Sequence, residues 1–402
     1  MDRPRTYEFQ GLRPIARCLQ NSMAKTKALC IFTTLLGYKA TTRGLMDTLD
    51  RTEDVDPTYV LLNAEDYSRY RTPWWTHVSN PWEAQYIARQ KVRPVLNRHF
   101  DILLVNSWEF VIAFRSLARK IPAAALIDSV PATVDAQLRR RGCGGWKRNL
   151  SAHFHHHAFG GAVRSYQYFL PMGSDSADSL ENCYQVKPEN CFVTLAPQNL
   201  DFWKPGPRTF SPRLRLLFVA NDFARKGGDF LLRLYAGHLA GTCTLTIASN
   251  DPSLERRALP PGVVWKRGCD RAELRQVYRE SDLFLFPMLQ DFMPQVLAEA
   301  LATGLPCIAN DVGGIRDLVH DDQNGFLMPY DSTEKLWADR IADLRSNPVE
   351  LARLARGARA FAIERLGMRR FEEVLCKVLN RLRSGGIDLP PLPVRQVRSA
   401  VS

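Results

Sequence analysis

Short hydrophobic runs bounded by turn-forming residues alternate along the chain with stretches whose hydrophobic residues recur at helical spacing. We predict strands at 28–34, 59–62, 101–105, 123–127, 214–220, 243–248, 263–266, 283–287 and 306–310. We predict helices at 229–239, 272–281, 294–303, 332–345 and 348–383, the last with a break at Gly367. Alternating strands and helices join parallel strands through right-handed crossovers. The pattern therefore predicts an α/β protein with doubly wound parallel sheets.

A proline-rich stretch near 204–213 separates the two series of strands, and 402 residues suffice for two domains. We predict a basic segment over 1–27 and two Rossmann-like domains over 28–205 and 206–365. We predict that a helix over 366–383 can cross back to the first domain and that a flexible proline-rich tail covers 384–402. Two such domains facing each other form a cleft at the carboxyl ends of their strands, where ligands bind in open α/β sheets.

Composition narrows the class of protein. Hydrophobic residues make up 45% and charged residues 24%, which excludes a collagen-like, coiled-coil or wholly disordered chain. The net charge of +12 suits an anionic partner: a nucleotide, a nucleic acid or a lipid headgroup. Nine cysteines without CxxC spacing indicate a reduced, cytoplasmic protein without a zinc ribbon. No apolar run approaches the ~20 residues of a membrane helix.

A basic, glycine-containing turn follows the predicted strand 214–220. It contains Arg225, Lys226, Gly227 and Gly228 and precedes a predicted helix. Glycines let the backbone approach a ligand, while a helix N-terminus and cations attract phosphate. The turn is therefore a candidate diphosphate site. The alternative is an exposed turn with solvated charges.

An acidic pair flanks the start of a later helix. Asp291 follows the predicted strand 283–287, the helix begins near Pro294, and Glu299 lies about one turn inside it. A carboxylate on a mostly apolar face needs a partner. Sugar and ribose hydroxyls would serve, and the alternative is a nearby Arg or a backbone amide. Gly313 and Gly314, after the next strand, permit close approach of the backbone to a ligand.

At these residues the sequence resembles the retaining GT-B glycosyltransferases of family 4. Asp291 and Glu299 have the acid–seven residues–Glu spacing of that family. Residues 266–284 match the segment that precedes this pattern in the family. Residues 225–228 resemble its basic diphosphate loop, and residues 196–205 resemble its interdomain segment. The match is strong over 165–330 and weak over 1–160.

The resemblance implies that the domain over 28–205 binds the acceptor and that the domain over 206–365 binds the donor, and it implies roles for single residues. It implies that Glu299 binds the donor ribose, that Asp291 contacts the donor sugar, and that Lys226 with Arg225 holds the diphosphate. The other donor-binding candidates are Gly227, Arg267, Gly268, Phe292, Met293, Pro294, Gly313 and Gly314. The implied donor is a nucleotide-diphospho-sugar, used without a metal or other cofactor and with retention. The implied acceptor is a glycan or lipid-linked molecule in polysaccharide or glycolipid biosynthesis.

Three positions depart from the family pattern. The first acid is Asp291 rather than Glu, and Asn221 stands where the family usually has Arg, which leaves more of the charge to Arg225. The N-terminal His often seen in the family is absent, and Asp128 stands at the corresponding place. Asp128 is a candidate catalytic residue that orients the acceptor hydroxyl. A helix-capping role is equally open.

Two further clusters have competing interpretations. A zinc site is one interpretation of His153, His155, His156 and His157, and a helix face or loop is the favoured one. The cations in 139–148 either contact an anionic membrane surface or form a solvated loop. Trp74 and Trp75 either line an acceptor groove or pack.

Other function classes compete with a transferase. A nucleotide-sugar epimerase of the same fold is one, and a non-catalytic nucleotide-sugar-binding protein is another. A nucleic-acid-binding protein is disfavoured because the positive charge is dispersed and no recognition motif is present. We therefore expect no nucleic-acid partner.

Overall fold

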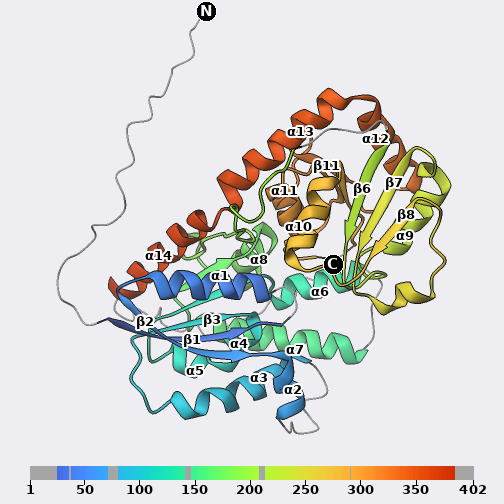
Figure 1. Ribbon diagram of the computed structural model, residues 1–402. Helices are drawn as coiled ribbons and strands as arrows, with labels where there is room; N and C mark the ends of the chain where they lie inside the picture. The colour runs from blue at the N-terminus through green and yellow to red at the C-terminus, as the bar shows by residue number, and fades with distance from the viewer. Residues whose placement is uncertain are drawn as a thin grey trace, which may run out of the picture.

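A computed structural model describes residues 25–35, 38–70, 80–140, 146–207, 213–289 and 291–384. It contains two parallel sheets, one in each half of the molecule (Figure 1). The N-terminal sheet has the order β2-β1-β3-β4-β5. Its strands are β1 (Thr26–Thr33), β2 (Val55–Leu62), β3 (Ile102–Asn106), β4 (Ala123–Ile127) and β5 (Tyr168–Pro171).

The C-terminal sheet has the order β11-β10-β9-β6-β7-β8. Its strands are β6 (Leu214–Val219), β7 (Cys243–Ala248), β8 (Val263–Lys266), β9 (Leu283–Phe286), β10 (Cys307–Asn310) and β11 (Gly325–Met328). In both sheets the order reverses beside the first strand. This reversal creates the crevice in which doubly wound sheets bind ligands.

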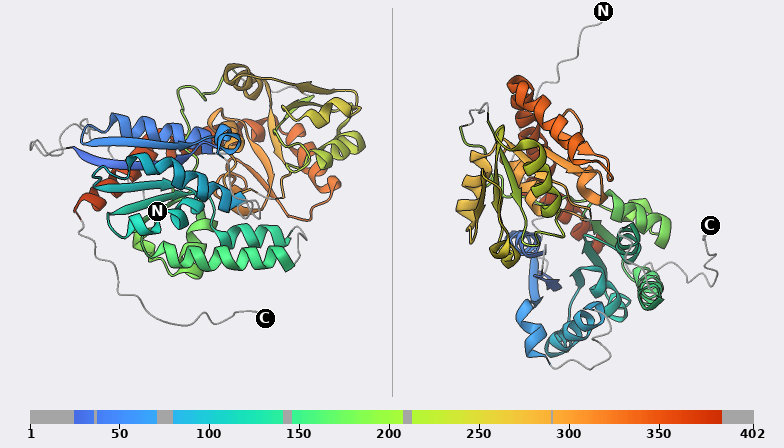
Figure 2. Two further views of the ribbon diagram at one scale, coloured as in Figure 1. Left: turned by 90° about the horizontal axis from the view of Figure 1, so that it is seen from below. Right: turned by 90° about the vertical axis from the view of Figure 1, so that its right-hand side faces the viewer.

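Helices cover both faces of each sheet (Figures 1 and 2). The N-terminal half contains α1 (Tyr38–Arg51), α2 (Ala64–Arg69), α3 (Asn80–Val92), α4 (Trp108–Ala113), α5 (Arg115–Ala118), α6 (Pro131–Arg140), α7 (Trp146–Val163) and α8 (Ser174–Tyr184). The C-terminal half contains α9 (Gly228–Leu234), α10 (Arg271–Glu280), α11 (Gln295–Ala302), α12 (Glu334–Ser346) and α13 (Pro348–Phe361), and α14 (Met368–Ser384) follows. Strand β1 shows the alternation that makes this layering stable. Ala28, Cys30 and Phe32 enter one core cluster, and Leu29 and Ile31 enter the other.

All nine predicted strands are present, with ends that differ by four residues at most. Two short strands were missed. Strand β5 has only four residues, and β11 begins with a glycine, so neither forms a long hydrophobic run. The predicted break at Gly367 is confirmed, because this residue has extended backbone between a π-helical turn (Ala362–Leu366) and α14.

The chain crosses between the two halves twice. The first crossing follows the N-terminal half, and the second leads into α14, which packs near β4. Leu375 and Leu379 of α14 share a core cluster with Ala124 and Leu126 of β4. The two crossings touch, since the Gln198 N–H donates to the Leu366 carbonyl at 2.7 Å.

Several predicted segments lie outside the described residues: 1–24 of the basic segment, Trp74 and Trp75, Arg141, and 385–402 of the tail. Arg139 is described, and its guanidinium pairs with Asp135 within α6 at 2.7 Å. Within the described part of the chain, no helix is both long enough and apolar enough to traverse a bilayer.

Candidate active site

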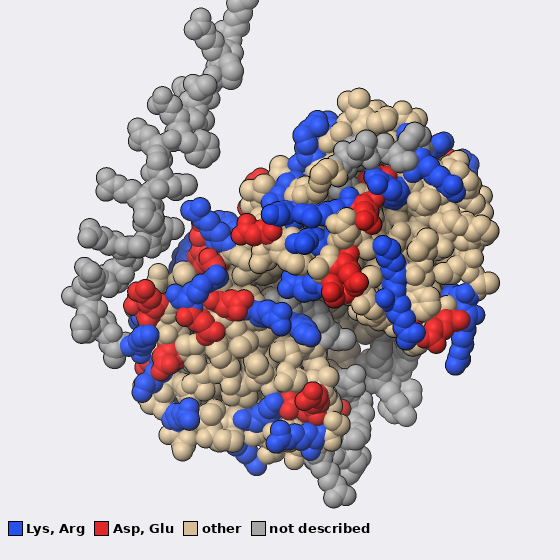
Figure 3. Space-filling model, in the orientation of Figure 1, with Lys and Arg blue, Asp and Glu red and all other residues tan. Residues whose placement is uncertain are grey.

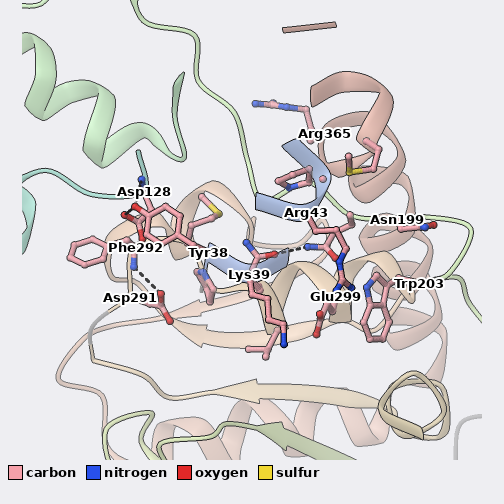
Figure 4. A pocket seen from close by; sticks show the side chains of 18 of the residues that line it. Tyr38, Lys39, Arg43, Asp128, Asn199, Trp203, Asp291, Phe292, Glu299 and Arg365 are labelled. Carbon is pink, nitrogen blue, oxygen red and sulfur yellow. Dashed lines mark hydrogen bonds between the residues drawn. The ribbon is translucent and has the colours of Figure 1, made fainter. Parts of the chain in front are cut away.

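A cavity of about 2180 Å³ lies between the two halves, at the carboxyl ends of strands from both sheets. Side chains that follow β1, β3 and β4 form one wall, and those that follow β6 and β9 face them (Figure 4). The four predicted catalytic residues all line this cavity, as do four of the nine predicted donor-binding residues: Asp128, Arg225, Lys226, Asp291, Phe292, Met293, Pro294 and Glu299.

The basic loop after β6 contributes two cations, both with acidic partners. The Lys226 ammonium pairs with the Asp291 carboxylate, and both side chains are mostly buried. The same ammonium lies 5.5 Å from the centre of the Phe286 ring. Arg225 pairs with Asp222 at 2.6 Å near the rim. An anionic ligand entering here would compete with carboxylates for both cations.

Gly227 is the residue of this loop that packs against the backbone of Pro287. Its φ is +89°, and a Cβ there would lie 2.3 Å from the Pro287 carbonyl oxygen. A side chain is therefore excluded by conformation and by space. Gly227 does not appear in the cavity wall. It lets the basic loop pack against the segment after β9.

The loop between β9 and α11 presents Asp291 to the cavity, and α11 presents Glu299. Asp291 accepts a hydrogen bond from the Phe292 N–H at 2.9 Å, and its carbonyl accepts one from Gln137 of the other half at 3.2 Å. Glu299 accepts a hydrogen bond from the Tyr278 hydroxyl at 3.2 Å. Burial raises the pKa of Glu299 to about 7, against the opposing effects of this hydrogen bond and of the Arg271 charge. The hydrogen-bond partner is thus a tyrosine rather than an Arg or a backbone amide.

Gly313 and Gly314 pack against the backbone of Asp291 and Phe292, in the loop between β9 and α11. They begin a 3₁₀ turn (Gly313–Asp317), and a Cβ on Gly314 would lie 1.8 Å from the Phe292 carbonyl oxygen. Their close approach is to this protein backbone, and neither is part of the cavity wall.

Arg267 and Gly268 also lie outside the cavity wall. Arg267 pairs with Glu255, and the Gly268 N–H donates to the Asn250 side chain at 2.8 Å.

The N-terminal wall contains carboxyl groups of its own. Asp128 accepts hydrogen bonds from the Tyr38 hydroxyl and from the Ser129 hydroxyl, the latter at 2.9 Å. Burial raises the pKa of Asp128, and the charge of Asp291 across the cavity adds to the increase. Glu109 accepts a hydrogen bond from Ser107, and burial raises its pKa to about 7.

Sequence reasoning missed Tyr38 and Glu109. One signal was available: Glu109 follows the predicted strand 101–105 by four residues, where loops of a doubly wound sheet reach the ligand. Ser107 marks the same loop, because its φ of +86° is rare for a residue with a side chain.

The histidine cluster lies on α7, away from this cavity wall. His155 is buried, with its ring 5.3 Å from that of Trp108, and a His156 ring nitrogen lies 3.0 Å from the Tyr184 hydroxyl oxygen. Among the described residues, no three His, Cys, Asp or Glu side chains are grouped so as to hold a metal ion.

Comparison with known proteins gives this site a context. Residues 213–347 match the family model described as "Glycosyl transferases group 1", so this part of the chain is similar to a group 1 glycosyltransferase domain. A D-inositol 3-phosphate glycosyltransferase of Saccharomonospora viridis is 27% identical over 237 residues, which are 50% of this chain and 52% of that protein. The chain thus spans about half the length of this curated relative.

Solved structures match nearly the whole chain. Sucrose-phosphate synthase from Thermosynechococcus elongatus superposes with a TM-score of 0.71 at 13% identity, covering 90% of this chain and all of that one. HepE of Anabaena in complex with UDP-glucose superposes with a TM-score of 0.64 at 14% identity, covering 88% of this chain and 99% of that one. These likenesses establish the GT-B fold, with two Rossmann-like halves, as predicted.

Proposed function

We propose that this chain is a retaining glycosyltransferase that moves a sugar from a nucleotide-diphospho-sugar to a hydroxyl of a glycan or lipid-linked acceptor. The observation that carries the proposal is the meeting of Lys226, Asp291 and Glu299 in one interdomain cavity, within a part of the chain similar to a group 1 glycosyltransferase domain. The names of the relative and of the UDP-glucose complex support this class of reaction and of donor.

In this proposal each residue acts on one part of the donor. Glu299, once ionised, accepts hydrogen bonds from the ribose hydroxyls, and Asp291 binds the sugar. The diphosphate displaces Asp291 from the Lys226 ammonium, which then faces the leaving group with Arg225 nearby. No metal or other cofactor is expected, because these cations would balance the charge that develops.

The transfer step balances without a covalent enzyme intermediate. The acceptor oxygen bonds to the anomeric carbon on the face from which the diphosphate leaves. The bond between that carbon and the phosphate oxygen breaks, and its electron pair goes to the diphosphate. The acceptor proton passes to the leaving phosphate oxygen. Asp128, with Tyr38 beside it, orients the acceptor hydroxyl.

We also propose that the enzyme works in the cytoplasm, in polysaccharide or glycolipid biosynthesis, and that it meets an anionic membrane surface. The net charge of +12 supports this part of the proposal.

Thermal unfolding with a panel of nucleotides and nucleotide-sugars tests the donor site. A ligand that binds only the folded state stabilises it by about 2.7 kcal/mol at a hundredfold excess over Kd. We expect one nucleoside diphosphate and its sugar to raise the Tm, and Lys226→Ala to remove the shift. Transfer to acceptors with the stabilising donor then identifies the reaction. No shift with any nucleotide would contradict the proposal.

A further inference from the structure

The N-terminal wall carries two cations that the mechanism above does not use. Lys39 and Arg43 both line the cavity and lie four residues apart on α1, which places them on one face of the helix. Neither forms an ion pair or hydrogen bond with another residue that the structure describes. Both side chains are exposed. Two positive charges without a described partner therefore face the cavity from the half opposite the basic loop.

A hydrogen bond between the two halves shows which part of the C-terminal half lies next to these cations. The Gln295 side chain donates to the Thr41 hydroxyl at 3.2 Å, so the start of α1 lies against the start of α11. Glu299 is one turn further along α11. In Figure 4, Lys39 and Arg43 appear between Asp291 on one side and Glu299 on the other. The two cations thus line the same cavity as the carboxylates proposed to bind the sugar and the ribose.

The opposite wall offers little unbalanced positive charge at this level. Lys226 pairs with Asp291, and Arg225 pairs with Asp222. Arg271 stacks on the Phe202 ring at 4.7 Å, and its charge acts on Glu299. The neutral Asn221 completes this part of the wall. Because Lys226 and Arg225 must first leave these carboxylates, further cations from the other wall would strengthen the binding of a diphosphate with two negative charges.

We propose that Lys39 and Arg43 bind the donor diphosphate from the N-terminal wall, so that both halves of the chain hold one donor molecule. This inference rests on the proposed function. The diphosphate is the only part of a nucleotide-sugar that carries formal charge, and it joins the two parts assigned to Asp291 and Glu299. A guanidinium can bind two phosphate oxygens at once, while an ammonium acts as a point charge. Negative charge grows on the diphosphate as the sugar leaves, so these cations also stabilise the transition state.

An anionic acceptor is the competing occupant of this wall. Arg365 and Arg370 also line the cavity. A phosphate on an acceptor would use the same chemistry as a phosphate on the donor. The two sources differ in one measurable respect, because only the donor assignment makes nucleotide binding depend on Lys39 and Arg43 in the absence of any acceptor.

Calorimetric titration of the full chain with UDP and GDP, and with uridine and guanosine, tests the assignment without an activity assay. For the diphosphate that binds the unmodified chain, we expect Lys39→Met and Arg43→Gln each to weaken binding about tenfold, and the double variant about a hundredfold. Affinity for the uncharged nucleoside should stay the same. Arg43→Lys should retain more affinity than Arg43→Gln.

Arg51→Gln is the matched control, because Arg51 lies on the same helix and lines the same cavity but pairs with Glu372. It should leave diphosphate affinity within twofold, and unchanged Tm values would show that the variants fold. Equal diphosphate affinity in the double variant and the unmodified chain would overturn the inference and leave the proposed function standing. An equal loss in Arg51→Gln would overturn it too, because the effect would then come from general charge. If the unmodified chain binds no nucleotide, the proposed function itself fails.

Discussion

Two carboxyl groups in the cavity wall, Glu109 and Glu299, have pKa values raised to about 7 by burial. A carboxyl group with a raised pKa is more easily ionised in the unfolded chain than in the folded one. As the pH rises, the carboxyl group of the unfolded chain therefore loses its proton before that of the folded chain. The free energy of unfolding then falls between about pH 4.5 and 7. A ligand that supplies hydroxyl donors offsets this cost, so these groups favour a bound polyol over an empty site.

For Glu299→Gln we predict opposite changes in stability and in ligand binding. Without nucleotide, the variant should be more stable than the unmodified chain at pH 8, and the difference should shrink as the pH falls towards 5. The reason is that Gln avoids burying a charge. Melting curves at pH 5 and 8 measure this. Nucleoside diphosphate affinity at pH 8 should fall about tenfold, because an ionised acceptor for the ribose hydroxyls is lost.

Glu109→Gln is the control for that pair of effects. It should change stability in the same direction without changing nucleotide affinity, since Glu109 lies near Asp128, which is proposed to orient the acceptor, and has no proposed contact with the donor. If Glu299→Gln bound nucleotide normally, the ribose role would be wrong.

At the scale of the element, the loop between β9 and α11 owes its position to backbone packing. The 3₁₀ turn that begins at Gly313 lies directly beneath it, and a Cβ on Gly313 would lie 2.2 Å from the Asp291 carbonyl oxygen. The two glycines therefore position the loop between β9 and α11, and they affect any reaction through the positions of Asp291 and Phe292.

Gly314→Ala should displace this loop. A methyl group 1.8 Å from the Phe292 carbonyl oxygen cannot be accommodated without a shift of the backbone, and overpacking of this kind costs roughly 1–3 kcal/mol. We predict a lower Tm and a weaker donor interaction. Gly237→Ala is the matched control, because nothing lies within 4 Å of its added Cβ and it should be nearly neutral. Equal Tm values for the two variants would contradict the packing role.

The C-terminal strands were mostly predictable because they are rich in hydrophobic residues: β9 is a continuous hydrophobic run, and β7 has buried hydrophobic residues that alternate with threonines. The spacing of Asp291 and Glu299 likewise identified two residues of the cavity wall. The other wall was not predictable in the same way. Tyr38 begins α1 and Glu109 lies in α4, and their proximity to Asp128 is a property of strand order that no local pattern encodes. The helices α3 and α7 also lack a strong apolar stripe.

At the scale of the whole molecule, Arg359 of α13 fastens the first crossing to the C-terminal half. Its guanidinium donates to the carbonyls of Trp203 and Ala302 at 2.9 and 2.7 Å, and to that of Leu200 at 3.3 Å. Trp203 is fully buried beside Tyr278, which in turn donates to Glu299. The charge distribution at the surface is mixed, with Lys and Arg interspersed among acids (Figure 3). One cation thus satisfies three backbone oxygens where the crossing meets the C-terminal half.

Arg359→Met should therefore destabilise the chain by roughly 2–3 kcal/mol, because its loss leaves partly buried carbonyls without a donor. Chemical denaturation measures the free energy of unfolding. Arg353→Met is the control on the same helix, since Arg353 makes an exposed pair with Glu350 and its loss should cost no more than about 0.5 kcal/mol. Equal costs for the two would contradict the fastening role.

The contact between the two crossings has a mechanical consequence. Two connections that were far apart would restrict the halves to rotation about the line between them, but connections that touch at Gln198 and Leu366 act as a single pivot. Among the described residues, three hydrogen bonds away from the pivot also join the halves, made by Gln137, by Gln295 and by Ser174 with Asp317. Each joins one half to the other through a single hydrogen bond. Opening the cavity therefore breaks only single hydrogen bonds at these points, and a donor held by both walls would add contacts that keep the two halves together.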